Sequence, residues 1–298
     1  MPYAIQIENL TKTFGSFTAV DKLNFTVNQS EVFGLLGPNG AGKTTTIKML
    51  CILILPSEGK AEVDGHDIVK EADEVRKEIG VVTEKLIAYD RLTSIENLSI
   101  FGRLYGVESK ILKERIEELL KLVDLWEFRK TRIGNFSSGM RQRFNIVRAL
   151  IHDHNIIFLD EPTIGLDPTS AYNIRELIKK LNIEQKKTIL LTTHYMDEAD
   201  RLSHRIGIID YGKIIALDTP SNLKSSVGSN ATLEDAFIKL TEVKIRDEPL
   251  KNNHIQRPGA RVLGSGIEAI IVPLLILVVI ATVTITLGVP LFDRAVRK

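Results

Sequence analysis

Residues 37–45 read Gly37-Pro38-Asn39-Gly40-Ala41-Gly42-Lys43-Thr44-Thr45, and this stretch decides the fold. It fits the pattern G-x-x-x-x-G-K-[ST] at every fixed position. Its glycines allow a tight turn and a close approach of the backbone to a ligand, because they have no Cβ. Successive backbone N–H groups, together with the positive end of a following helix, make a concave site for anions. The stretch therefore predicts a loop that holds the phosphates of a nucleoside triphosphate.

The residues on either side of this loop support that interpretation. Val32–Leu36 is apolar and predicts a short buried strand, whereas Thr45–Leu50 has the pattern of a helix start. A glycine-rich turn that arose by chance would have no reason to lie between a strand and a helix. Within the loop, we expect Lys43 to act as a mobile cation for the outer phosphates and the Thr44 hydroxyl to be a ligand of Mg²⁺.

Two further strand patterns end in polar residues. Ile156–Leu159 runs directly into Asp160 and Glu161, and Thr188–Thr193 runs into His194. Ligands of α/β sheets bind at the carboxyl ends of parallel strands. We therefore expect Asp160 to hold Mg²⁺ and Glu161 to orient or deprotonate a water molecule, while His194 donates a hydrogen bond to a γ-phosphate oxygen. The alternatives are a solubilising strand end for the acids and a structural role for the histidine.

A helical pattern with charged residues between its apolar positions predicts a helical insertion at about residues 85–150. The insertion ends at Ser137-Ser138-Gly139-Met140, where serine and glycine before a helix indicate an N-cap. This pattern alone leaves a plain helix cap and a second phosphate contact as equal alternatives. The sequence after Glu161 predicts an ordered turn as far as Asp167, because proline disfavours a helix there.

The amino-terminal part has the pattern of strands. An alternating opening segment, Met1–Glu8, is followed by a predicted turn at Thr13–Val20 and by another strand at Leu23–Val27. We also expect a turn at Pro56–Lys60. Phe14 lies 23 residues before Gly37 and offers a ring for stacking on a base, although core packing is the simpler interpretation of this residue alone.

Composition excludes several classes of protein. A net charge of +1 over 298 residues provides no general attraction to nucleic acid. Cys51 is the only cysteine, so the sequence predicts no disulfide framework and favours a reducing compartment. The amino terminus lacks the charged and apolar regions of a signal peptide.

The carboxyl-terminal part departs from this globular composition. Residues 269–292 contain no Asp, Glu, Lys or Arg over 24 positions, whereas a membrane-spanning helix needs about 20 apolar residues. We therefore expect a linker at 249–266 and a transmembrane segment with a basic tail at 267–298. Arginines precede and follow the apolar segment, so the distribution of positive charge does not decide its orientation.

Taken together, the motifs resemble those of the ATP-binding subunit of an ATP-binding cassette (ABC) transporter. The resemblance covers roughly residues 5–248 and rests on motifs that agree in order and spacing with those of the family. These are Walker A at Gly37–Thr45, the signature at Ser137–Met140, Walker B at Ile156–Glu161, the D-loop at Gly165–Asp167 and the switch histidine His194.

This resemblance implies an α/β fold with a P-loop NTPase core, in which a mixed sheet has flanking helices. It also implies an antiparallel β subdomain beside the helical insertion and the carboxyl-terminal apolar helix. The ATPase domain is expected at residues 1–248. In this family Phe14 and Val20 pack on adenine, and two chains dimerise head to tail, so that the signature and Asp167 of one chain complete the ATP site of the other. Lys43, Glu161 and His194 are then the catalytic residues, with ATP and Mg²⁺ as cofactors.

The segments after residue 218 resemble the tails of drug-exporter ATPases of the daunorubicin-resistance type, which work with a separate membrane permease. The resemblance implies an ATPase at the cytoplasmic face of the membrane that drives export of a drug-like or lipid-like compound, with an anchor in the apolar tail as our hypothesis. Two positions depart from the family. Ser138 replaces a glycine of the signature, and Glu84 replaces the glutamine of the Q-loop, where its carboxylate remains a potential Mg²⁺ ligand.

Two other functions remain open from the sequence. One is a soluble ABC ATPase with no role in transport, although such proteins usually carry two cassettes or a long coiled coil. The other is a catalytically weak regulator that binds nucleotide, which the substitutions at Glu84 and Ser138 suggest.

Overall fold

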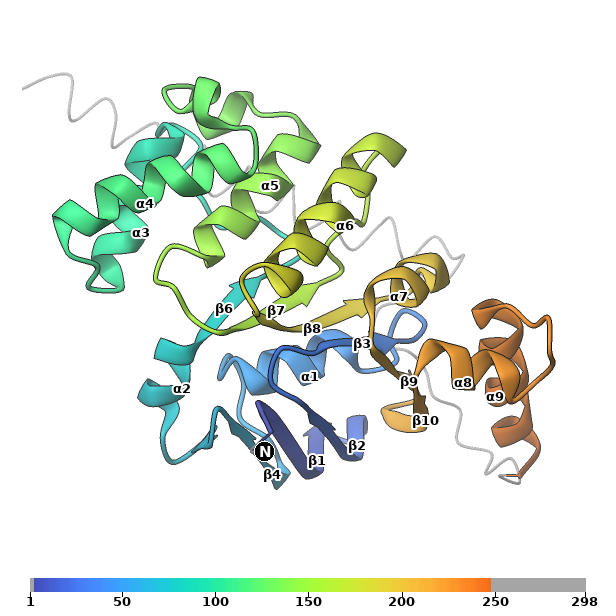
Figure 1. The fold of residues 1–298 in the computed structure, drawn as a ribbon. Helices are drawn as coiled ribbons and strands as arrows, with labels where there is room; N and C mark the ends of the chain where they lie inside the picture. Colours follow the sequence, from blue (N-terminus) through green and yellow to red (C-terminus); the bar gives the residue numbers. More distant parts are fainter. Residues whose placement is uncertain (1–2, 248–298) are drawn as a thin grey trace, which may run out of the picture. The chain divides into compact units, whose positions relative to one another are not determined.

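The computed structural model describes residues 3–247 of the chain. Its central sheet has six strands in the order β10-β9-β3-β8-β7-β6 (Figure 1). All neighbouring strands are parallel except β10, which is antiparallel to β9, so the predicted mixed sheet is confirmed. The strands are β3 (Val32–Leu36), β6 (Ile79–Val82), β7 (Ile156–Asp160), β8 (Thr188–Thr193), β9 (Arg205–Asp210) and β10 (Lys213–Asp218).

Alternating side chains of the central strands enter two different cores. In β7, Ile157 and Leu159 pack with helices α5 (Ser138–Ala149) and α6 (Pro168–Ile183), whereas Ile156 and Phe158 pack on the opposite face with α1 (Lys43–Leu50). Figure 1 shows α5 and α6 on one face of the sheet and α1 on the other. Because both faces are covered, every residue of β3, β7 and β8 is buried, as in other parallel sheets.

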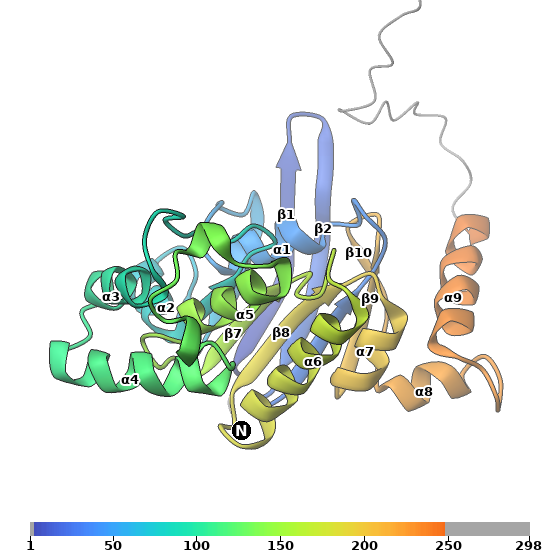
Figure 2. The same ribbon diagram turned by 90° about the horizontal axis from the view of Figure 1, so that it is seen from above.

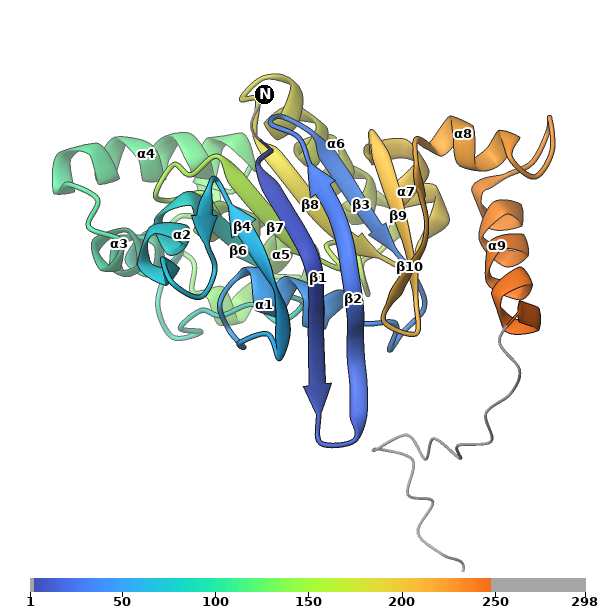
Figure 3. The same cartoon turned by 90° about the horizontal axis from the view of Figure 1, so that it is seen from below.

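A second sheet is antiparallel and has the order β2-β1-β4-β5. The turn predicted at Thr13–Val20 is present but much shorter, because Thr13 pairs with Thr18 and Phe14 pairs with Phe17 in one long hairpin. Only two residues form the turn, and Figures 2 and 3 show the hairpin projecting beyond the helices. Cross-strand pairing thus overrides the local turn signals. The strands are β1 (Ile5–Phe14), β2 (Phe17–Val27), β4 (Glu58–Val63) and β5 (His66–Asp67), so the turn predicted at Pro56–Lys60 is also partly strand.

Helices occupy most of the predicted insertion. The amphipathic pattern of α4 buries Leu112, Ile116, Leu119 and Leu120 on one side, and most of its charged residues lie on the other. Thr93 and Glu96 form a reciprocal capping box at the start of α3, which satisfies backbone N–H groups of its first turn. The helical segments before α5 are α3 (Ser94–Leu104), α4 (Ser109–Leu122) and two short 3₁₀ turns, η1 (Trp126–Phe128) and η2 (Ile133–Asn135).

The remaining helices are α2 (Ala72–Glu78), α7 (Met196–Leu202), α8 (Pro220–Ser225) and α9 (Leu233–Asp247). Within residues 3–247, no helix is both long enough and apolar enough to cross a membrane. The predicted apolar helix at residues 269–292 lies outside the described part of the chain.

Candidate active site

The sheet order brings the predicted motifs together at one edge. Strand β3 leads into the phosphate loop, β8 ends just before His194, and β7 ends at Asp160. These three parallel strands are neighbours, and their register pairs Leu36 with Thr193 and Asp160 with Thr192. The carboxyl edge of the sheet therefore holds every predicted residue of Walker A, Walker B and the switch, at the place where α/β sheets bind ligands.

Two positions of the loop require glycine for different structural reasons. Gly42 has φ 105°, and a Cβ there would lie 2.6 Å from the carbonyl oxygen of Ala19. Gly40 has φ 85°, a backbone conformation that residues with a side chain rarely adopt. Gly42 also immediately precedes α1, which begins at Lys43. The loop thus meets the helix amino terminus closely, as an anion site requires.

A hydroxyl and a carboxylate face each other beside the loop. Thr44 Oγ1 donates to Asp160 Oδ1 at 3.0 Å, and Thr192 Oγ1 donates to the same oxygen at 2.7 Å. Burial raises the pKa of Asp160, the two hydroxyls oppose that rise, and the charges of Glu161 and Glu84 increase it. No three or more His, Cys, Asp or Glu residues among 3–247 form a metal cluster. Thr44 and Asp160 are nevertheless the oxygen donors that Mg²⁺ prefers when phosphate oxygens supply its other ligands.

Glu161 lies between two partners. Its Oε1 is 3.1 Å from Lys43 Nζ, and its Oε2 is 2.8 Å from His194 Nδ1. The backbone N–H of Glu161 donates to the carbonyl oxygen of Thr192 at 3.1 Å. Glu161 has φ 51°, an uncommon conformation for a residue of this kind, and its neighbours on β8 hold it there. The structure thus places the predicted base and the switch histidine in direct contact.

Lys43 is almost entirely buried and has several acceptors. Its ammonium donates to the carbonyl oxygens of Gly37 at 2.6 Å and Pro38 at 3.0 Å, in addition to the ion pair with Glu161. A cation held this close to the loop amides lies where the outer phosphates of a nucleotide are expected. A triphosphate can therefore replace these partners of Lys43 without leaving the charge of the lysine unpaired.

The signature forms the start of α5. Ser137 is its N-cap and accepts a hydrogen bond from the backbone N–H of Met140 at 3.3 Å, which confirms the predicted cap. Ser137 and Ser138 are exposed, whereas Gly139 is buried against Ser170 of α6. Asp167 caps α6 through Ser170, so the D-loop and the signature helix are adjacent.

The two residues expected to contact the base differ in exposure. Phe14 is 51% exposed, and its ring lies 5.1 Å from Lys12 Nζ. Val20 has no exposed surface, and its side chain lies against the position of Gly42. Phe14 is thus accessible to a ligand, whereas Val20 packs beneath the loop, and the base contact of both residues stays a prediction.

Sequence reasoning missed two residues of this edge. Thr192 contacts both acids of Walker B, and the side-chain amide of Gln142 donates to the carbonyl oxygen of Pro162 at 2.7 Å. Gln142 thereby connects the signature helix with the turn after Glu161. Its place near the carboxyl end of a buried strand, next to Thr193 and His194, is the one signal that points to Thr192.

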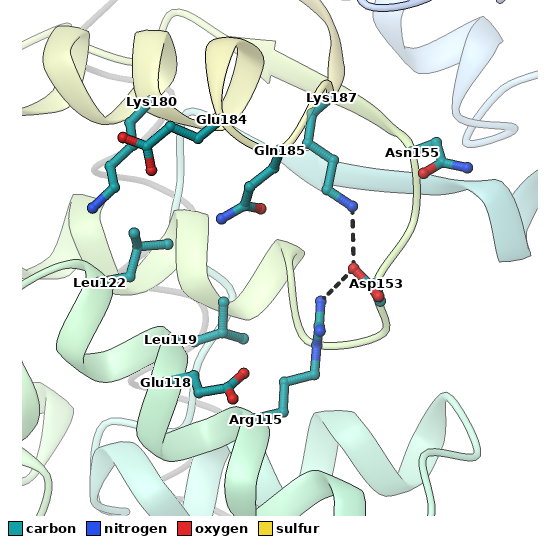
Figure 4. Close-up of a pocket in the computed structure, with 10 residues that line it drawn as sticks. All are labelled: Arg115, Glu118, Leu119, Leu122, Asp153, Asn155, Lys180, Glu184, Gln185 and Lys187. Carbon is teal, nitrogen blue, oxygen red and sulfur yellow. Dashed lines mark hydrogen bonds and ion pairs between the residues drawn. The ribbon is translucent and has the colours of Figure 1, made fainter.

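A cavity of about 630 Å³ lies at the opposite edge of the sheet, near the amino ends of β7 and β8. Asp153 there is 2.8 Å from Arg115 and 3.1 Å from Lys187, as the dashed lines in Figure 4 show. None of the predicted site residues lines this cavity. Its lining consists of Arg115, Glu118, Leu119, Leu122, Asp153, Asn155, Lys180, Glu184, Gln185 and Lys187.

The fold and the carboxyl edge together define a P-loop ATPase of the ATP-binding cassette class. A family model described as "ABC transporter" matches residues 20–164. The linearmycin resistance ATP-binding protein LnrL of Bacillus subtilis (strain 168) is 42% identical over 237 residues, which are 80% of this chain and 74% of that protein. The daunorubicin/doxorubicin resistance ATP-binding protein DrrA of Streptomyces peucetius is 43% identical over 227 residues, or 76% and 68%. The chain belongs to the ABC transporter ATP-binding proteins.

Solved structures agree with this assignment. An ATP-binding subunit of an ABC transporter superposes with a TM-score of 0.72 at 28% identity, covering 80% of this chain and 99% of that one. A dimeric ATP-binding cassette in a post-hydrolysis state with ADP and Pi superposes with a TM-score of 0.66 at 28% identity, covering 72% and 98%. The chain is an ABC-type ATPase that binds and hydrolyses ATP.

Proposed function

We propose that this ATPase couples hydrolysis to the export of a drug-like or lipid-like compound through a separate membrane permease, at the cytoplasmic face of the membrane. The names of its relatives support this substrate class, since LnrL and DrrA are resistance proteins. In this proposal residues 1–248 form the ATPase domain, with the helical insertion at about 85–150. Residues 249–266 form a linker, and residues 267–298 associate with the membrane.

The observation that carries the catalytic proposal is the contact of Glu161 with both Lys43 and His194. When ATP binds, its phosphates replace Glu161 and the loop carbonyl oxygens as the partners of Lys43, which lies beside the loop amides. Glu161 is then released from the lysine and accepts a proton from the attacking water, while His194 donates to a γ-phosphate oxygen. The buried site excludes bulk water, which strengthens each of these interactions.

Thr44 and Asp160 are proposed as the protein ligands of Mg²⁺, with Glu84 nearby. Bound Mg²⁺ neutralises charge that develops on the phosphates during the reaction. Glu84 is exposed, yet its charge raises the pKa of Asp160, so the two carboxylates lie near one another. A cation between them relieves that repulsion.

The signature supports a head-to-tail homodimer. Ser137 and Ser138 are exposed at the amino terminus of α5, where the helix has the positive end of its dipole. We infer that this terminus contacts the nucleotide in the phosphate loop of a second copy, together with Met140 and Asp167. Each ATP then lies between two chains.

A size measurement tests this arrangement. Glu161→Gln slows hydrolysis and is expected to double in mass on gel filtration when Mg-ATP is added. The Glu161→Gln, Ser137→Arg double variant is expected to bind ATP but to remain a monomer, because the bulky cation blocks the exposed terminus. The matched control adds Ser109→Arg instead, at an exposed serine at the start of α4. An ATP-dependent dimer with Ser137→Arg contradicts the proposed contact.

Export is tested with the permease that co-purifies with the chain from membranes. In sealed vesicles that contain both proteins, Mg-ATP is expected to drive movement of daunorubicin, used as the probe. Lys43→Ala is expected to abolish that movement while the complex still assembles. Assembly without ATP-dependent movement of amphipathic probes argues against a drug-like substrate.

A further inference from the structure

Glu198 is a carboxyl in the first turn of α7, four residues after His194, and its side chain is 0% exposed. An acid in a first helical turn normally lies in solvent, where it interacts with the helix dipole at no desolvation cost. Its neighbours Asp197 and Asp200 keep partly exposed side chains with ion pairs to basic residues. Burial of Glu198 alone therefore points to a specific partner inside the protein.

One partner is Thr163. Its hydroxyl donates to Glu198 Oε1 at 2.8 Å, and Thr163 is itself only 4% exposed. Among the described residues, Glu198 Oε2 has no hydrogen-bond partner. Burial raises the pKa of Glu198, the hydroxyls of Thr193 and Thr163 oppose the rise, and the charge of Glu161 adds to it. The two carboxyls thus lie close enough to influence each other.

The Thr163–Glu198 bond joins two segments that also meet in the active site. Thr163 belongs to the turn after Glu161, which is closed by a hydrogen bond from Ile164 N–H to the Glu161 carbonyl oxygen at 3.2 Å. Glu198 belongs to the helix that follows His194. The same two segments are also joined by the 2.8 Å contact of Glu161 with His194. The Glu161–His194 bond lies in the catalytic site, whereas the Thr163–Glu198 bond is buried.

We propose that Glu198 is a positioning residue for hydrolysis, which acts through Thr163 to hold the side chains of Glu161 and His194 in contact. A glutamate at positive φ keeps that conformation only where its surroundings fix it. Holding Thr163 fixes the end of the short turn, and with it the direction of the Glu161 side chain. This inference rests on the catalytic roles proposed above for Glu161 and His194.

Rate and affinity separate this role from simple packing. Replacing both partners of a buried hydrogen bond by apolar residues of similar size is often nearly neutral for stability, whereas replacing one partner leaves the other unsatisfied. A positioning role instead lowers kcat for Mg-ATP, because a small misplacement of a reacting group costs rate and leaves the phosphate loop intact. Nucleotide affinity is therefore expected to change little in each variant, and the melting temperature of the full chain is expected to change little in the double variant, which removes both groups.

The test is steady-state ATP hydrolysis by the purified full chain over a range of ATP concentrations. Glu198→Met and Thr163→Val are each expected to lower kcat about 10-fold. KM is expected to stay within about 2-fold. Glu198→Gln and Thr163→Ser keep the acceptor and the donor and are expected to retain about half of kcat or more.

The double variant Glu198→Met, Thr163→Val is expected to have the same kcat as the single variants, because each of the three removes the same hydrogen bond. Asp197→Asn, on the exposed side of the same helix, is the control with unchanged kcat.

Wild-type kcat in Glu198→Met overturns the proposal. So does a parallel fall of kcat, nucleotide affinity and melting temperature in the double variant, which indicates a structural role only. Glu161→Gln in the same assay separates this inference from the function on which it rests. If Glu161→Gln retains turnover, the proposed catalytic roles fail; if it loses turnover while Glu198→Met keeps it, only the role of Glu198 fails.

Discussion

Strand β7 has an acidic residue with positive φ near each of its ends, and each acid is paired with a buried lysine. Before the strand, Asp153 has φ 56° and lies 3.1 Å from Lys187. After the strand, Glu161 has φ 51° and lies 3.1 Å from Lys43. The side chain of Asp153 is 66% exposed and that of Glu161 is 9% exposed. Similar pairs at the two ends thus meet very different surroundings.

This difference supports the proposal that only the Glu161 end takes part in hydrolysis. Aspartate adopts positive φ readily, and solvent screens the charge of Asp153, which has two basic partners. Glutamate adopts positive φ rarely, and burial strengthens each interaction that Glu161 makes. The glycine loop beside Glu161 also supplies carbonyl oxygens that bind Lys43 and that a triphosphate can replace. We therefore expect the Asp153 pair to stabilise the fold and the Glu161 pair to take part in hydrolysis.

The largest expected effect comes from removing the lysine at each end. Lys43→Ala is expected to lower ATP turnover by about 10²–10³-fold, because it removes a cation from the phosphate site. Lys187→Ala is expected to leave turnover per folded molecule within about 2-fold and to lower the free energy of unfolding by roughly 1–2 kcal/mol, since the exposed Asp153 stays hydrated. ATPase assays and urea unfolding measure the two quantities. Equal losses of turnover in both variants would contradict the claim that only the Glu161 end of β7 takes part in hydrolysis.

A smaller effect is expected from threonines at the two ends of β8. Thr192→Val removes hydrogen bonds to Asp160 and to the backbone N–H of Glu161, so turnover is expected to fall about 10-fold. Thr188→Val is the matched control, because its buried hydroxyl accepts a hydrogen bond from Ser30 at the opposite end of the strand. Both variants are expected to lose about 1 kcal/mol of stability. Comparable turnover in the two variants means that Thr192 has no special part in the site.

The smallest effect concerns the dependence of stability on pH at the amino end of β7. Burial lowers the pKa of His154 well below 6.5, with further lowering by the charges of His152, Lys187 and Arg115. The unfolded chain then binds more protons than the folded chain just below pH 6.5, so stability falls as the pH drops through that value. Urea unfolding at pH 7.5 and 5.5 measures this loss, which His154→Leu is expected to reduce. An equal loss in that variant assigns the pH dependence to other groups.

Much of this site was predictable from local sequence. The glycine loop fixes its own backbone, and short apolar runs that end in Asp160, Glu161 and His194 indicate parallel strands with functional ends. The structure confirms these strands and brings their ends together. The register of the strands explains why residues more than 30 positions apart, such as Glu161 and His194, are in contact.

The rest depends on tertiary contacts that no local pattern contains. Glu198 is one of several acids in a short helix, and only the packing of α7 shows that it is buried while Asp197 is exposed. Thr192 lies in an apolar strand, and its role follows from the register with β7. The length of the turn after Phe14 also depends on cross-strand pairing, since Phe14 pairs with Phe17 and leaves only Gly15 and Ser16 in the turn.

The most direct test of the central claim is ATP turnover by two variants with the same chemical change at the two ends of β7. The account predicts that Glu161→Gln lowers turnover at least about 100-fold while ATP still binds. It predicts that Asp153→Asn, which also replaces a carboxylate by an amide next to a buried lysine, keeps turnover within about 2-fold of the wild type. Turnover by Glu161→Gln at the level of Asp153→Asn would contradict the account.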